Sequence, residues 1–70
     1  MNSLAVSKNL KKQMKKWSAT EKSVATMIGV TERCVNNWLN GRRQPSAYAI
    51  LRLSRLFNCK MEDLMEGIDG

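Results

Sequence analysis

Apolar residues recur along this chain with the spacing of α-helices, in five short segments that each have one apolar face. In the first segment, roughly residues 4–17, this face is formed by Val6, Leu10, Met14 and Trp17. Lysines fill much of the opposite face, so the segment is predicted to be an amphipathic helix. Its apolar stripe is narrow and leads directly into further globular patterning, which favours packing within the protein over binding to a membrane surface.

Two short helices joined by a tight turn are predicted between residues 20 and 41. Gly29 separates them, at a position where the end of a helix needs a residue that tolerates positive φ. Thr31 can cap the next helix by accepting hydrogen bonds from free N–H groups of its first turn. This arrangement is typical of a helix-turn-helix, and its inward-facing residues are expected to be Val24, Ala25 and Ile28, then Val35, Trp38 and Leu39.

The start of the first of these two helices has two interpretations. Ser18 and Glu21 fit a capping box, whereas Thr20 is the cap if the helix begins later. After the second helix, the pair Asn40-Gly41 predicts a turn, with Gly41 in the left-handed conformation that ends a helix.

The fourth predicted helix spans about residues 47–57 and follows Ser46, a good N-cap residue. Asn58 is suited to a left-handed C-cap. A last short helix at about residues 61–66 is expected to fray, because Lys60 is a poor N-cap. The apolar face of the fourth helix is expected to contain Ala47, Ile50, Leu51, Ser54 and Phe57, widened by Leu53 and Leu56.

The chain is therefore predicted to be one all-α domain of five helices, ordered over about residues 5–66, with a disordered tail at residues 67–70. Seventy residues bury only a modest fraction of their surface, so the core must come from a few compact helices. The expected core consists of Leu10, Val24, Ala25, Ile28, Val35, Trp38, Ile50, Leu51 and Phe57.

The outward face of the third predicted helix is polar. With Val35 and Trp38 inward, a helical repeat of about 100° per residue places Arg33, Asn37 and Asn40 on the opposite side. Such side chains suit the donor and acceptor pattern of base edges in a DNA major groove, which is wide enough for an α-helix. The alternative interpretation is an ordinary solvated face, but two arginines in the following loop favour a DNA-binding surface, and the candidate residues are Glu32, Arg33, Asn36, Asn37, Arg42 and Arg43.

The charge distribution supports a polyanionic partner. Twelve Lys and Arg residues oppose six Asp and Glu, for a formal net charge of +6. Four of the six acidic residues lie within the last nine positions. Residues 1–61 therefore carry a higher net positive charge than the chain as a whole. Such a field attracts nucleic acid or an acidic membrane surface.

Several other functions find no support in the composition. The chain has no histidine, and Cys34 and Cys59 lack CxxC spacing, so no metal site is expected and both cysteines are interpreted as small buried hydrophobes in a reducing cytoplasm. No catalytic constellation, Gly-rich phosphate loop or run of transmembrane length is present in the sequence. We expect no enzyme activity, no cofactor, no small-molecule ligand and a cytoplasmic location.

Three stretches carry a family resemblance: TEKSVATMIGVT, VNNWLNGRRQPS and ILRLSRLFNCKMEDLM. Together they resemble the lambda-repressor-like helix-turn-helix family, which includes Cro, phage repressors and the xenobiotic-response-element group of bacterial regulators, over about residues 6–66. The resemblance implies base contacts from the start of the third helix, at Glu32, Arg33 and Asn37 with Asn36 adjacent. It implies phosphate contacts from the start of the second helix, the Asn-Gly turn and the basic loop, at Glu21, Lys22, Asn40, Arg42 and Arg43.

The sequence departs from the family pattern at three places. Glu21 stands where Gln is common, so either Glu21 turns to a capping role or Lys22 takes over the phosphate contact. Met14 and Leu39 replace an Arg–Glu ion pair, and we expect an apolar contact between them, since losing both charges together can be neutral or stabilising. Lys60 replaces the usual Ser or Thr cap of the last helix.

The resemblance and the residues together predict a sequence-specific transcriptional regulator of double-stranded DNA, most simply a repressor. The alternative is a protein-interaction module, such as an antitoxin or antirepressor, which should instead show an apolar patch on the third helix. A single domain of this kind contacts one half-site, and a weak homodimer on DNA would contact two. Candidate dimer contacts, which can equally be core residues, are Met61, Leu64 and Met65.

Overall fold

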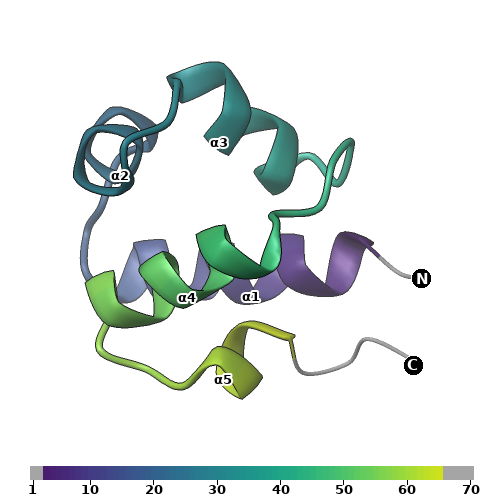
Figure 1. The fold of residues 1–70 in the computed structure, drawn as a ribbon, viewed down its shortest axis with the longest axis vertical. Coiled ribbons are helices and arrows are strands. Elements are labelled where there is room, and N and C mark those ends of the chain that lie inside the picture. Colours follow the sequence, from purple (N-terminus) through teal and green to yellow (C-terminus); the bar gives the residue numbers. More distant parts are fainter. Residues whose placement is uncertain (1–2, 66–70) are drawn as a thin grey trace.

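The computed structural model describes residues 3–65, and within them the chain forms helices and no strand (Figure 1). The predicted all-α fold is confirmed, with helix ends close to those expected. The disorder expected at residues 67–70 and the last residue of the expected fifth helix lie outside the described residues. The helices are α1 (Ser3–Lys16), α2 (Glu21–Ile28), α3 (Glu32–Leu39), α4 (Ala47–Leu56) and α5 (Met61–Met65).

The start of α2 follows the second of the two interpretations. The Thr20 side chain accepts a hydrogen bond from the Ser23 backbone N–H, and the Ser23 hydroxyl oxygen accepts one from the Thr20 N–H, each at 3.0 Å. Ser18 has a φ of 53° and lies just beyond the end of α1. The capping box is therefore built from Thr20 and Ser23, and the alternative pair of Ser18 and Glu21 is wrong.

Three other predicted helix caps are confirmed. Thr31 caps α3 by accepting from the Cys34 N–H at 3.1 Å, and Ser46 caps α4 in the same way through Ala49. Gly29 ends α2 with a φ of 78°, in the left-handed region where a side chain would add strain. These local signals fix the angle at which α3 leaves α2.

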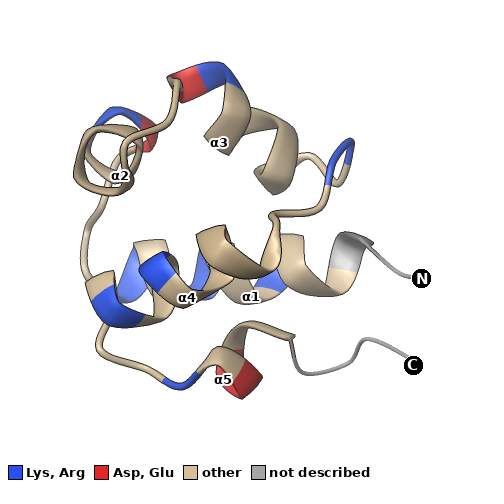
Figure 2. Ribbon diagram, in the orientation of Figure 1, with Lys and Arg blue, Asp and Glu red and all other residues tan. Residues whose placement is uncertain are grey.

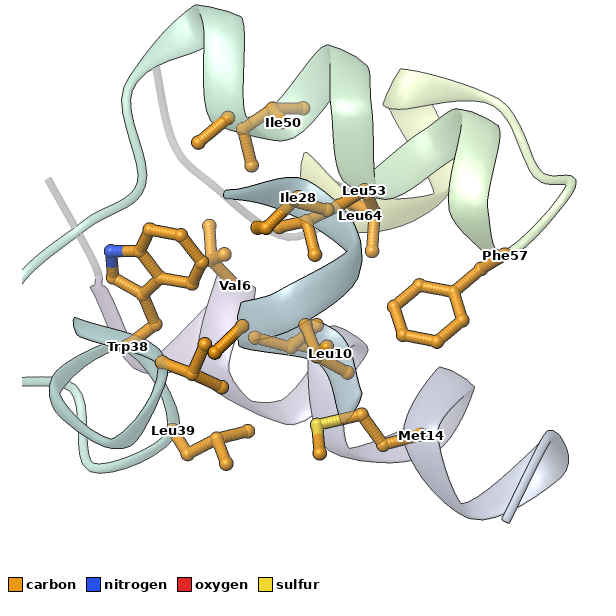
Figure 3. Packing of buried hydrophobic residues seen from close by; sticks show 14 residues of the cluster. Val6, Leu10, Met14, Ile28, Trp38, Leu39, Ile50, Leu53, Phe57 and Leu64 are labelled. Atoms are coloured by element: carbon orange, nitrogen blue, oxygen red, sulfur yellow. The ribbon is translucent and has the colours of Figure 1, made fainter. Parts of the chain in front are cut away.

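One apolar core lies between the helices, and α1 packs against both α3 and α5, while α4 packs against α2 and α5. Trp38, only 4% exposed, lies inside this core with Val6 and Ile28 nearby (Figure 3). Met14 and Leu39 are both buried in the same cluster, so apolar side chains occupy the positions of the family's ion pair.

The buried face of α4 differs from the expected one. Leu51 is only half-buried and Ala47 is exposed, whereas Leu53 is completely buried. Apolar residues occur on almost every side of this helix, so periodicity alone could not orient it. Packing against α2 and α5 turns the helix so that its inward residues are Ala49, Ile50, Leu53, Ser54 and Phe57, the last lying beyond the helix end.

Two side chains of α1, and one directly after it, form hydrogen bonds that the sequence pattern did not indicate. The Ser7 hydroxyl donates to the Leu39 carbonyl at the end of α3, and Asn9 donates to the Leu64 carbonyl in α5 at 2.9 Å. Both acceptors belong to the last turn of a helix, where carbonyls have no partner within the helix. Trp17, expected on the apolar face of α1, is 52% exposed and donates its indole N–H to the Phe57 carbonyl at 3.1 Å.

Candidate nucleic-acid interface

The N-terminal end of α3 projects freely from the molecule. Glu32 and Arg33 are exposed in its first turn, directly after the Thr31 cap, and Figure 2 shows the acidic and basic positions side by side at this end. Asn37, one turn further on, is half-buried. Within the described residues, Arg33 forms no hydrogen bond or ion pair with the protein, so its guanidinium is available to a ligand.

Asn36 lies in a hydrogen-bonded chain that links α2 to α3. Its amide nitrogen donates to Glu21 Oε1 at 3.2 Å, and its amide oxygen accepts from Asn40 Nδ2 at 3.1 Å. Asn40 Nδ2 also donates to the Asn36 backbone carbonyl at 2.8 Å. The side chain of Asn36 therefore fixes the position of α3 against the start of α2.

Glu21 does not have the capping role that was one of the two alternatives expected from the sequence. Thr20 and Ser23 provide the capping interactions, and the Glu21 carboxylate instead accepts the hydrogen bond from Asn36. No sequence signal identified this contact, because the two residues are fifteen positions apart and lie on different helices. The neighbouring Lys22 is exposed at the same end of α2.

The loop after α3 holds two further basic residues, Arg42 and Arg43, both exposed. Their backbone N–H groups donate to the Asn37 carbonyl, at 2.9 and 3.3 Å, and Gly41 has a φ of 69° as predicted. These bonds fold the loop back onto the end of α3. Figure 2 shows basic positions at the start of α2, the start of α3 and this loop, all in the half of the molecule away from α5.

The structure therefore brings the residues singled out from the sequence to one region, formed by the start of α2, the exposed side of α3 and the loop that follows. α3 has eight residues and is about 12 Å long, a size that fits a major groove. The polar side chains of α3 lie between Lys22 at the start of α2 and the two arginines of the loop after α3. Such an arrangement suits a duplex, with bases at the centre and phosphates at the edges.

In the part of the chain that the structure describes, no group of three His, Cys, Asp or Glu side chains comes together in a way that could hold a metal ion, and no helix has the length and apolar character of a membrane span. Cys34 and Cys59 are free thiols, half-buried rather than fully buried as expected. Burial raises the pKa of the Cys59 thiol, Asp63 adds to the effect and Lys16 opposes it, so the thiol form is favoured.

Comparisons with known proteins agree with the helix-turn-helix arrangement of α2 and α3. A family model described as Helix-turn-helix matches residues 8–64. No curated protein sequence matches the chain.

Several solved structures share the fold. The SOS-response transcriptional repressor LexA from Eubacterium rectale is 29% identical, with a TM-score of 0.87, over 99% of this chain and 78% of that one. The P22 c2 repressor in complex with a synthetic operator is 21% identical, with a TM-score of 0.82 and coverage of 90% and 96%. The restriction-modification controller protein C.AhdI from Aeromonas hydrophila is 18% identical, with a TM-score of 0.82 and coverage of 89% and 94%.

Proposed function

Since this chain belongs to the helix-turn-helix family of the Cro and phage-repressor type, we propose that it is a transcriptional repressor that inserts α3 into the major groove of double-stranded DNA. The observation that carries the proposal is the free N-terminal end of α3, where Arg33 has no partner among the described residues. Exposed basic side chains lie on either side of α3, with Lys22 at the start of α2 and Arg42 and Arg43 in the loop after α3.

Base contacts are assigned to the exposed side of α3. The forked donors of Arg33 match guanine O6 and N7, and the amide of Asn37 matches adenine N6 and N7. Glu32 can accept from cytosine N4. Asn36 belongs to the same surface, and its hydrogen bonds to Glu21 and Asn40 suit it to holding α3 at the depth that these contacts require.

Phosphate contacts are assigned to the residues that flank α3. Lys22 lies on one side, and Asn40, Arg42 and Arg43 lie on the other. These residues would position the protein on the duplex without distinguishing sequences. In the cytoplasm or nucleoid of a bacterium, occupancy of a promoter by such a domain would block transcription.

A homodimer on DNA completes the proposal, with two copies on half-sites about one helical turn apart. Of the three candidate dimer residues, Leu64 is fully buried in the core and has no surface to offer a second copy. Met65 is 42% exposed and Met61 is half-buried, so these two remain candidates for a weak contact.

The experiment is selection of bound sites from random duplex DNA, followed by binding measurements at several salt concentrations. We expect enrichment of one short motif. Arg42→Ala and Arg43→Ala should weaken binding to all sequences about equally, and each should reduce the slope of log K against log[salt] by roughly 0.9. Selection that enriches no motif would contradict sequence-specific binding, and an unchanged salt slope would remove that arginine from the phosphate contacts.

A further inference from the structure

Three adjoining hollows lie along α2 and α4 and the segments next to them. The central hollow, of about 390 Å³, is lined mainly by apolar side chains, among them Met27, Tyr48, Leu51 and Leu56. A second hollow, towards Trp17, shares Met27 and Leu56 with it, and a third, towards the α3–α4 loop, shares Tyr48. The shared lining residues make the three hollows one surface, which we call the α2–α4 furrow.

Exposed apolar side chains gather along this furrow. Four large apolar residues are markedly exposed among the described ones, and three of them line it: Trp17 at 52%, Met27 at 62% and Tyr48 at 65%. Single exposed apolar residues are normal on a protein surface, whereas a contiguous group marks an interaction site. The fourth, Met65, lies on α5 and does not line the furrow.

The charge of the furrow identifies the chemistry of its occupant. Its charged lining residues are Arg43, Arg52 and Arg55, and no acidic residue lines any of the three hollows. Arg52 donates to the Tyr48 hydroxyl at 3.1 Å and lies 5.7 Å from the centre of its ring. This contact orders both side chains but leaves the positive charge without a carboxylate partner.

We propose that the α2–α4 furrow binds an amphipathic helix of another protein, with apolar residues along one side and Asp or Glu beside them. The apolar side would cover Met27, Leu51 and Leu56, and the carboxylates would meet Arg52 and Arg55. α4 has ten residues and is about 15 Å long, so two to three turns of a partner helix match its length.

A second copy of this chain fits the furrow less well. Two furrows that face each other would bring Arg52 and Arg55 of both copies together, and like charges oppose such contact. The acidic helix α5 has only five residues, and its Leu64 is fully buried, so it offers little apolar surface beyond Met65.

The furrow and the proposed DNA surface are largely separate. Glu32, Arg33 and Asn37 do not line the furrow, and only Arg43 belongs to both. A partner helix could therefore bind while α3 is in the groove. This proposal also stands without DNA binding, because the residues assigned to the contact with the partner helix lie on α2 and α4.

The test uses a fluorescein-labelled helical peptide of fifteen residues, with leucines at i, i+3, i+4 and i+7 and glutamates beside them. Fluorescence anisotropy with the full chain should give saturable binding, with a Kd below about 100 μM. Met27→Gln and Arg55→Glu should each weaken it at least about tenfold, since each removes part of the apolar or ionic contact. Both positions are exposed, so the fold should be preserved, and circular dichroism checks this.

Matched control variants show whether peptide binding depends on the furrow or on other parts of the surface. Met65→Gln changes an exposed methionine on α5, and Lys12→Glu reverses an exposed charge on α1, and neither should alter peptide binding. Arg55→Glu should gain affinity for a version of the peptide with lysine in place of glutamate. DNA binding by Met27→Gln should equal that of the parent, so the two proposals can fail independently.

Three results would overturn the proposal. The first is the absence of saturable peptide binding up to about 1 mM. The second is an equal loss in Met27→Gln and Met65→Gln, which would mean non-specific adhesion. The third is that the chain self-associates in sedimentation experiments and that Met27→Gln abolishes this self-association. The furrow would then be an interface between copies of this chain.

Discussion

Single residues in this domain differ in how freely they can meet a ligand. Arg33 has no partner among the described residues, whereas Asn36, on the same helix, is held by both Glu21 and Asn40. A free guanidinium can adopt the bidentate geometry that guanine requires. An amide that already has partners would have to exchange them for a base, so sequence discrimination should depend more on Arg33 than on Asn36.

Arg33→Ala should therefore cost about 1–3 kcal/mol on the cognate site and relax the preference at one base pair. The measurement compares the cognate site with its single-base variants at one fixed salt concentration, for the parent and the mutant. Arg42→Ala is the control, because a lost phosphate contact weakens all sites alike. Equal loss on every variant for Arg33→Ala would assign this residue to phosphate contact instead.

At the scale of the helices, the contact between α2 and α3 depends on a carboxylate near a surface proposed to meet phosphates. Glu21 accepts the hydrogen bond from Asn36 at 3.2 Å, but its negative charge opposes an approaching polyanion. The bond needs an acceptor oxygen and does not need the charge. The two contributions can therefore be separated by one substitution.

Glu21→Gln should keep the acceptor for Asn36 and raise the affinity for every duplex several-fold, because a repulsive charge is removed from the interface. Binding is measured on the cognate site and on random DNA at low salt, where surface charges are least screened. Glu62→Gln on α5 makes the same change at an exposed site away from α3, and its gain should be smaller. An affinity lower than that of the parent would show that the carboxylate itself is needed.

The local features of the helices were predictable from the sequence, and the distant ones were not. Caps at Thr31 and Ser46 and the left-handed Gly29 depend on neighbouring residues, so a short stretch determines them. The contact from Ser7 to Leu39 joins residues thirty-two positions apart, and no local pattern specifies such a pair. The same is true of the candidate site. Arg33 could be identified from its position on the exposed face of the predicted helix, but the hydrogen-bond partners of Asn36 could not.

For the whole molecule, stability depends on a small shared core in which Trp38 is the largest side chain. It is 4% exposed and lies in the cluster to which α1, α2, α3, α4 and α5 all contribute. Small domains have a low free energy of unfolding. The loss of one large core residue should therefore affect every helix together.

Trp38→Ala should lower the free energy of unfolding by roughly 3–5 kcal/mol, because it removes buried apolar surface and leaves a cavity. Trp17→Ala is the matched control: this residue is 52% exposed and its indole makes one hydrogen bond, so its loss should cost about 1 kcal/mol. Urea denaturation followed by circular dichroism gives both values. Equal midpoints for the two variants would contradict the assignment of Trp38 as the central core residue.

The bond from Asn9 to Leu64, which spans fifty-five positions, has a consequence for the order of events during protein synthesis. α2 and α3 leave the ribosome before α5 does, so α1 cannot yet pack against its last partner. Until Leu64 packs in place, the apolar side of α1 that faces α5 is exposed to solvent. The nascent helix-turn-helix should therefore be open to proteases and chaperones, and it should become competent for DNA only after α5 has been added.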